Sequence, residues 1–151
     1  AMICGGVSQG IEPNVANVFN QPGPAGEITR INPELLKIMK AKNKNNRSVI
    51  TSIIDNAGSV SHVNWLTDEE KAVFKTAFEI NQEVILRLAS LRQQYIDQAQ
   101  SINLFFSADE SEEYISKIHQ IAFRDKNIKS LYYMRSRAGI SASKECESCE
   151  G

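Results

Sequence analysis

Residues 102–136 read INLFFSADESEEYISKIHQIAFRDKNIKSLYYMRS, and this stretch decides the fold. Its two ends, INLFF and SLYYMRS, are rich in aliphatic and aromatic residues, which is typical of short strands. The segment between them carries apolar residues at spacings of three and four, namely Tyr114, Ile115, Ile118, Ile121 and Ala122. That periodicity predicts a helix of about 15 residues, with its start signal at residues 107–110. Strand, helix and strand in this order predict a right-handed βαβ unit with parallel strands, and hence an α/β fold.

Upstream, residues 15–20 (VANVFN) and 27–31 (EITRI) flank glycines and prolines and predict a hairpin. Asn32 and Pro33 then open a predicted short helix over residues 33–42, which ends in the polar run KNKNNR. Thr67 and Glu70 form a capping box, which predicts a single helix of about seven turns ending near Tyr95. Its apolar positions would be Val73, Phe74, Ala77, Ile80, Val84, Leu88 and Leu91.

Composition excludes several classes of protein. With 151 residues, of which 42% are hydrophobic and 23% charged, the chain fits one ordinary globular unit. A net charge of −1 gives no field that would attract nucleic acid or a membrane surface. No stretch approaches the roughly 20 apolar residues that span a bilayer. Three cysteines and an N-terminus without signal-peptide features indicate free thiols and a cytoplasmic location.

The periodic pattern stops after Arg137, so we expect a segment 1–137 that folds and a mobile tail at 138–151. The tail carries Cys146 and Cys149, two thiols in a CxxC spacing that could exchange with an external disulfide. Incidental surface cysteines are one alternative, and half of a zinc site is another. Zinc needs about four ligands, and the remaining candidates stand at no motif spacing. These candidates are Cys4, His62 and His119.

Two further stretches hold candidate functional residues. Tyr132 and Tyr133 are adjacent in a predicted buried strand, where the residues alone favour packing over chemistry, because neighbouring strand residues face opposite ways. Residues 5–14 (GGVSQGIEPN) could bind an anion through main-chain N–H groups, but they match no nucleotide-binding motif. Glu12 in this stretch is a general acid or base, or a carboxylate that fixes a turn. The lysines and arginine of residues 37–47 are read as a solvated helix end without a function.

Four blocks in order, SQGIEPNVANVF, TRINPELL, IDQAQSINLFF and LYYMRSR, followed by the terminal CxxC, resemble the C-terminal part of the large (catalytic) subunit of ribonucleotide reductase. The resemblance covers essentially the whole chain. It implies the C-terminal portion of a ten-stranded α/β barrel, incomplete alone over residues 1–137. The implied activity is that of a ribonucleoside-diphosphate reductase, which converts ribonucleotides to deoxyribonucleotides.

The resemblance also implies roles for single residues. Tyr132 and Tyr133 match a stacked pair that relays a radical from the small subunit, which overturns the packing interpretation and favours class I. Cys146 and Cys149 match tail thiols that reduce the active-site disulfide and are recharged by thioredoxin or glutaredoxin. Ala1 and Met2 match the end of the loop that binds the substrate's phosphates. The turn at residues 10–13 is expected to be structural.

Partners follow from the same resemblance. This segment is expected to bind no metal or cofactor itself, whereas the holoenzyme needs a small subunit with a metal-generated radical and nucleotide effectors bound elsewhere. Catalysis would also need a ribonucleotide substrate and the upstream portion of the large subunit. Apolar residues at 102–106 and 131–134 are expected to face that missing portion. We favour one piece of a split subunit; a truncated fragment and a stand-alone thiol-redox or adaptor protein are the alternatives.

Overall fold

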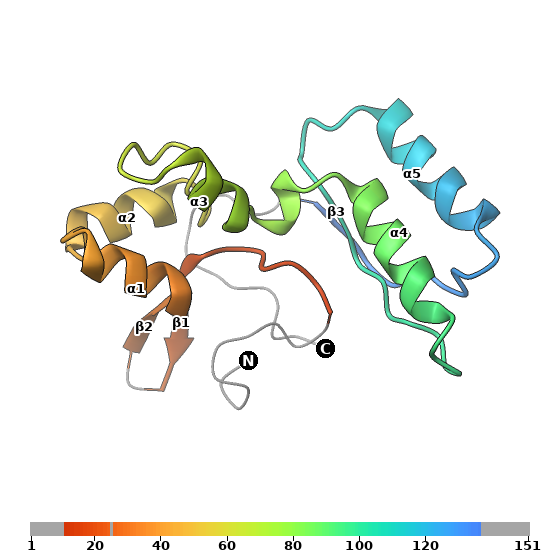
Figure 1. Ribbon diagram of the computed structural model, residues 1–151, viewed down its shortest axis with the longest axis horizontal. Coiled ribbons are helices and arrows are strands. Elements are labelled where there is room, and N and C mark those ends of the chain that lie inside the picture. Colours follow the sequence, from red (N-terminus) through yellow and green to blue (C-terminus); the bar gives the residue numbers. More distant parts are fainter. Residues whose placement is uncertain (1–10, 25, 137–151) are drawn as a thin grey trace. The chain divides into compact units, whose positions relative to one another are not determined.

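The computed structural model describes residues 11–24 and 26–136, which divide into two compact units, residues 11–77 and residues 78–136 (Figure 1). The first unit contains a hairpin and three short helices, and the second contains two helices and a pair of strands. A single turn of 3₁₀ helix, Ala77–Glu79, lies at the division between them. No helix formed by these two ranges combines the length and the hydropathy that crossing a bilayer requires.

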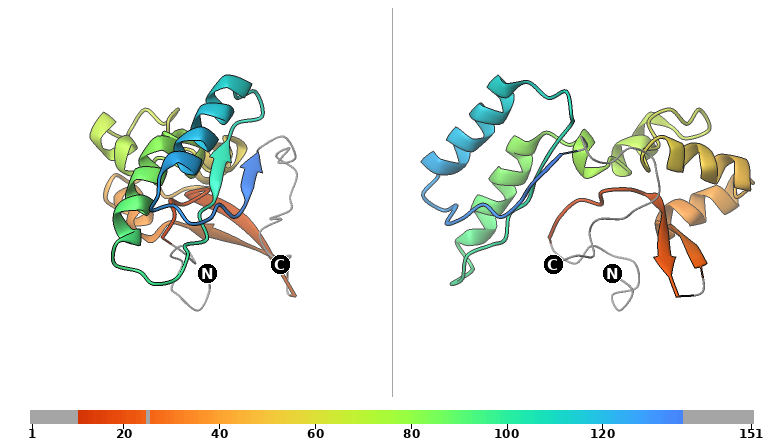
Figure 2. Two further views of the ribbon diagram at one scale, coloured as in Figure 1. Left: turned by 90° about the vertical axis from the view of Figure 1, so that its right-hand side faces the viewer. Right: turned by 180° about the vertical axis from the view of Figure 1, so that it is seen from behind.

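The predicted hairpin is confirmed. Strands β1 (Val18–Gly23) and β2 (Gly26–Ile31) pair antiparallel, with Val18 opposite Ile31 and Gly23 opposite Gly26 (Figure 2). Gly26 has a φ of +112°, a backbone conformation that side chains disfavour, which explains a glycine at the start of β2.

Three helices pack beside the hairpin in the first unit. In α1 (Pro33–Ala41), the side chain of Asn32 accepts a hydrogen bond from the Glu34 N–H, and proline occupies the first turn, as predicted. Helix α2 (Arg47–Asp55) is capped by Asn46, and the sequence pattern does not predict it, because the polar run before it indicates only a turn. The apolar faces meet in one core, formed by Val18, Leu35, Met39, Ile53, Val60, Val63, Leu66 and Phe74.

The single helix predicted from Thr67 to Tyr95 is wrong. Helix α3 (Asp68–Val73) has the predicted capping box but ends after six residues, and α4 (Gln82–Gln93) begins anew. Asn81 caps α4 by accepting from the Glu83 N–H, and asparagine is more favourable at such a cap than inside a helix. The predicted apolar face is also largely exposed: Val73 is 78% exposed, and Val84, Leu88 and Leu91 are exposed as well.

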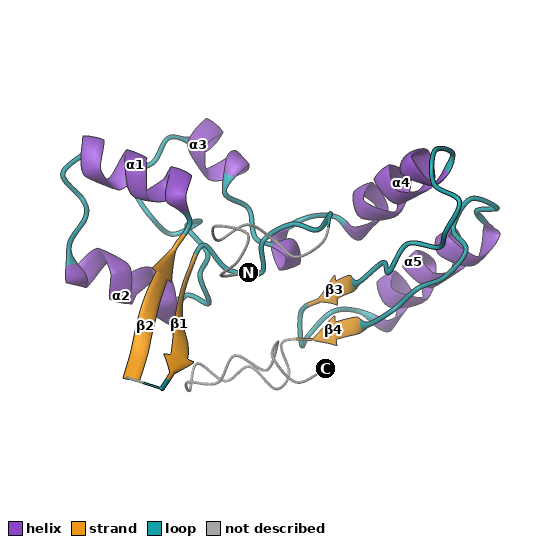
Figure 3. Ribbon diagram, turned by 90° about the horizontal axis from the view of Figure 1, so that it is seen from below, coloured by secondary structure: helices purple, strands orange, loops and turns teal. Residues whose placement is uncertain are grey.

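The second unit confirms the predicted βαβ order. Strand β3 (Leu104–Phe106), helix α5 (Glu112–Arg124) and strand β4 (Met134–Ser136) follow one another, and the two strands run parallel, as their arrows in Figure 3 show. Helix α4 packs against both β3 and α5. Residues 102–106 are all buried, which contradicts the expectation that they face a missing partner. Tyr132, Tyr133 and Met134 are exposed, as that expectation requires.

Candidate functional site

The two adjacent tyrosines of the second unit form a close, hydrogen-bonded pair with tilted rings. The Tyr132 hydroxyl donates to the Tyr133 hydroxyl at 3.1 Å, and the ring centroids lie 3.9 Å apart at an interplanar angle of 51°. Ordinary aromatic pairs in proteins have centroids about 4.5–7 Å apart, so these rings are unusually close. The two phenols therefore contact each other both through their hydroxyl oxygens and through their rings.

Three hydrogen bonds from the β3 region hold the main chain of the pair. The Tyr132 N–H donates to the Ile102 carbonyl at 2.8 Å, and the Tyr133 carbonyl accepts from the Leu104 N–H at 2.9 Å. Between them, the Tyr133 N–H donates to the side-chain oxygen of Asn103 at 3.1 Å. The buried segment 102–104 therefore fixes the position of both tyrosines.

The prediction that this pair lies in a buried strand is wrong. Tyr132 and Tyr133 precede β4, which begins at Met134, and their exposed fractions are 59% and 48%. Packing within this chain therefore does not account for two large aromatic side chains here.

The charge around the pair affects its titration. The hydrogen bond to Tyr133 raises the pKa of Tyr132 above its ordinary value, because only the neutral phenol can donate that bond. Repulsion from Tyr133 and partial desolvation raise the pKa further, whereas Arg135 lowers it. The Arg135 guanidinium also lies 5.3 Å from the centre of the Tyr133 ring, within the range of a cation–π contact.

This arrangement suits the exchange of a hydrogen atom between the phenols. If one oxygen carries a radical, an electron can pass between the two closely spaced rings while the proton moves along the O–H···O bond. The first tyrosine becomes a neutral phenol and the second a neutral phenoxyl radical. Neither ring acquires a net charge, so neither a phenolate nor a cation radical has to form during the transfer.

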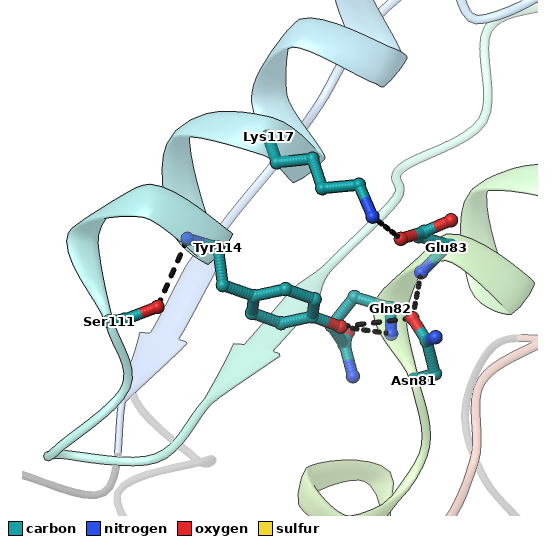
Figure 4. Close-up of polar contacts among 6 residues, drawn as sticks. All are labelled: Asn81, Gln82, Glu83, Ser111, Tyr114 and Lys117. Atoms are coloured by element: carbon teal, nitrogen blue, oxygen red, sulfur yellow. Dashed lines mark hydrogen bonds and ion pairs between the residues drawn. The ribbon is translucent and has the colours of Figure 1, made fainter.

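Polar contacts join helix α5 to the start of α4 (Figure 4), and a further hydrogen bond from Gln82 positions β3, and thereby the pair. The Tyr114 hydroxyl donates to the side-chain oxygen of Asn81 and accepts from the Gln82 N–H, both at 3.0 Å. The side-chain oxygen of Gln82, which is buried, accepts from the Phe105 N–H at 2.9 Å. Helix α5, the start of α4 and strand β3 are thus joined through hydrogen bonds.

An ion pair also joins the two helices of this unit. The Lys117 ammonium of α5 donates a hydrogen bond to the Glu83 carboxylate of α4 (Figure 4), and this bond raises the pKa of Lys117. The pair lies on the surface, where ion pairs stabilise only weakly.

The other predicted site residues, Ala1, Met2, Cys146 and Cys149, lie outside the described residues, as does Cys4.

The remaining candidates make local contacts. His62 contacts Ser52, and His119 contacts the Ile115 carbonyl one turn away. Within residues 11–24 and 26–136, no cluster of three or more histidine, cysteine, aspartate and glutamate side chains is placed to hold a metal ion. Ile11 and Glu12 lie in a bend, in keeping with the expected turn.

Sequence reasoning missed two residues beside the pair, Asn103 and Arg135. Asn103 had a signal, because it is a polar residue inside the apolar run INLFF and so needs a hydrogen-bond partner when buried. Arg135 had none, since a basic residue in a short strand near a chain end is ordinary.

Comparison with known proteins gives a consistent result. The family model described as ribonucleotide reductase, barrel domain, matches residues 1–134. The chain is 38% identical to the ribonucleoside-diphosphate reductase large subunit of Invertebrate iridescent virus 3, covering 100% of this chain and 26% of that protein. The large subunit from Danio rerio is 31% identical over 90% of this chain, which corresponds to 17% of its own length.

A solved structure agrees with these sequence matches. The class Id ribonucleotide reductase alpha subunit of Actinobacillus ureae superposes with a TM-score of 0.78 and 36% identity, covering 90% of this chain and 24% of that subunit. The chain thus spans about a quarter or less of the length of these relatives. The resemblance inferred from the sequence is confirmed, and the chain belongs to the ribonucleotide reductase large-subunit family, corresponding to the C-terminal portion of its α/β barrel domain.

Proposed function

We propose that this chain supplies the radical-transfer tyrosines of a class I ribonucleoside-diphosphate reductase large subunit. The observation that carries the proposal is the contact between Tyr132 and Tyr133, whose oxygens lie 3.1 Å apart and whose ring centroids lie 3.9 Å apart. The names of the relatives support the reaction, since they are ribonucleoside-diphosphate reductase large subunits.

The relay consists of one balanced step within this chain. With the radical on Tyr133, the Tyr132 phenol gives its electron through the ring contact and its proton along the hydrogen bond to the Tyr133 oxygen. Tyr133 is then a phenol and Tyr132 a phenoxyl radical. The same geometry serves the reverse step, so the radical can return after each turnover. The radical originates in a metal-containing small subunit, and this chain needs no cofactor for the transfer.

The termini complete the proposed role. Ala1 and Met2 contribute main-chain N–H groups to the site for the substrate's phosphates. Cys146 and Cys149 reduce the active-site disulfide by thiol exchange: two thiols give up two electrons and two protons and become a disulfide. Thioredoxin or glutaredoxin then reduces that disulfide. The proposed location is the cytoplasm, where such reductants operate.

The chain acts together with the upstream portion of the large subunit, the small subunit and nucleotide effectors bound elsewhere. A split subunit, in which a second polypeptide supplies the upstream portion, remains our prediction. Co-expression with the upstream portion of a matching large subunit tests it, followed by size-exclusion chromatography with light scattering. A stable complex that reduces ribonucleotides only when both pieces and the small subunit are present is expected. Two pieces that never associate would contradict the split arrangement.

Phenylalanine variants test the tyrosine pair in that assembly. Tyr132→Phe and Tyr133→Phe each remove the hydroxyl through which the hydrogen atom passes, so turnover should fall to background while the complex still forms. The control is Tyr95→Phe, because Tyr95 is 89% exposed and lies outside the pair. A Tyr132→Phe or Tyr133→Phe enzyme that turned over as fast as the control would refute the proposed relay.

A cysteine variant tests the tail separately. Cys146→Ser should abolish turnover driven by thioredoxin, because the tail can no longer form or pass on a disulfide. Turnover with a small dithiol that reaches the active site directly should survive. Loss of both activities would contradict a shuttle that acts only in re-reduction.

A further inference from the structure

The pairing of β3 with β4 is interrupted beside the tyrosine pair. In the regular part, Leu104 lies opposite Met134 and Phe105 opposite Arg135. If this register continued toward the N-terminus, the Tyr133 N–H would donate a hydrogen bond to the Ile102 carbonyl. That carbonyl accepts instead from the Tyr132 N–H. The chain therefore accommodates one extra residue before β4, which is a bulge.

The bulge explains how the rings of adjacent tyrosines can contact each other. Along a regular strand, successive side chains point to opposite faces, and successive main-chain N–H groups point to opposite edges. Here the N–H groups of both Tyr132 and Tyr133 are directed to the β3 segment, at Ile102 and Asn103. Between Tyr132 and Tyr133 the side chains therefore do not alternate between opposite faces, and the two rings come into contact.

The bulge also means that the Tyr133 N–H needs an acceptor that a regular strand pairing would have supplied. The Tyr133 N–H is turned toward the segment in which the carbonyl that a regular register would offer it, that of Ile102, already accepts from Tyr132. A main-chain N–H without an acceptor in such a place destabilises the conformation that puts it there. The side-chain oxygen of Asn103 accepts this N–H at 3.1 Å, from a side chain that is buried.

We propose that Asn103 is a positioning residue for the tyrosine pair: its amide oxygen accepts the Tyr133 N–H and thereby stabilises the one-residue bulge that brings the two phenols together. The catalytic consequence rests on the proposed function, whereas the effect on the geometry does not.

Two substitutions separate the acceptor from the size of the side chain. Asn103→Asp keeps an oxygen at the same reach, and Asn103→Leu keeps the volume but has no acceptor. In NMR of the full chain, Asn103→Leu should increase the hydrogen exchange rate of the Tyr133 amide by about tenfold, the factor for losing one such bond. The nuclear Overhauser effect between the Tyr132 and Tyr133 rings should weaken as well. Asn103→Asp should retain both signals.

A matched control removes a similar bond from the same strand. Gln82→Met deletes the side-chain oxygen that accepts from the Phe105 N–H and the amide that donates to the Ile80 carbonyl, and both contacts lie outside the bulge. It should lower the stability of the unit but leave the ring contact in place. If Asn103→Leu fails to fold, Asn103→Ser, which is too short to reach the Tyr133 N–H, replaces it. Retention of both Tyr133 signals in the variant without an acceptor would overturn the proposal, as would equal loss in Gln82→Met or in Asn103→Asp.

Turnover in the assembled enzyme then separates this inference from the proposed function. Asn103→Leu should lower kcat without changing KM for the ribonucleotide, and Asn103→Asp should restore kcat. If the NMR results hold but Tyr133→Phe turns over normally, the relay fails and the positioning stands. If Tyr133→Phe is inactive and Asn103→Leu has full kcat, the relay stands and the positioning role fails.

Discussion

Replacing Gly58 by alanine should damage the first unit more than any strain in φ alone would. Gly58 has a φ of +75°, and a Cβ there would lie 2.3 Å from the Cβ of Ala16, 2.7 Å from its Cα and 3.0 Å from the Val18 carbonyl oxygen. The left-handed conformation costs about 1–2 kcal/mol for an alanine. Forcing the backbone at Ala16 to move costs about 1–3 kcal/mol more, as for other overpacked sites. The free energy of unfolding should fall by about 2–5 kcal/mol.

Gly26 provides the matched control. It also has a positive φ, +112°, but a Cβ there would meet no atom within 4 Å. Gly26→Ala should therefore cost the conformational part alone, and because φ +112° is at least as unfavourable for alanine as φ +75°, a larger loss in Gly58→Ala indicates the clash. Ala16→Gly in the Gly58→Ala background removes the closest atom and should recover part of the loss.

The assay uses Trp65, the single tryptophan of the sequence, which packs against the core of this unit. Urea unfolding followed by tryptophan fluorescence therefore reports on the first unit. With an m-value of about 1.5 kcal/mol per M, a loss of about 3 kcal/mol lowers the midpoint by about 2 M. A Gly58→Ala midpoint equal to that of Gly26→Ala would refute the clash.

Three further predictions concern polar groups. The hydrogen bond from Lys42 lowers the pKa of Glu70, so its stabilisation is present above pH 4.5 and is lost as the pH falls through the folded pKa. Glu70→Gln should therefore flatten the acid side of a stability-against-pH curve, and an unchanged curve would contradict this. Tyr114→Phe removes two hydrogen bonds and should lower the free energy of unfolding by about 1–2 kcal/mol, measured by circular dichroism. Tyr133→Phe should lower the pKa of Tyr132 in an ultraviolet titration, because the bond that favours the neutral phenol is gone.

The elements that the sequence predicted correctly depend on local patterns. The β1–β2 hairpin follows from two short apolar runs around a glycine and proline turn, and the parallel β3–β4 pair follows from a helix of sufficient length between two strands. Helix α1 carries its own start signals in Asn32 and Pro33. Residues close in sequence supply the information in each case.

The prediction of one long helix is wrong because the apolar residues of two separate helices, α3 and α4, happen to follow the same spacing. Val73 and Val84 continue one period across residues 74–81, yet both are exposed, and the capping by Asn81 starts a new helix. The buried side of α4 includes Gln82 and Gln93, which hydropathy counts as polar. Their hydrogen bonds to Phe105 and to the Ile96 and Gln98 carbonyls make that burial possible, and these partners lie outside α4.

The candidate site, too, could be predicted from the sequence only in part. The pair Tyr132 and Tyr133 could be found from the sequence through family resemblance, but its geometry could not. The close contact of the rings depends on a bulge and on Asn103, which is 30 residues away from Tyr133 along the chain. Alternation in a regular strand predicts the opposite arrangement, with the rings on different faces.

The central claim is that Tyr132 and Tyr133 carry a radical in ribonucleotide reduction. The most direct measurement is the ribonucleotide reduction rate of the assembled enzyme containing Tyr133→Phe, relative to Tyr95→Phe prepared in the same way. We predict that the Tyr95→Phe enzyme retains full activity and that the Tyr133→Phe enzyme has only background activity while assembling normally. Equal rates in the two enzymes would contradict the claim.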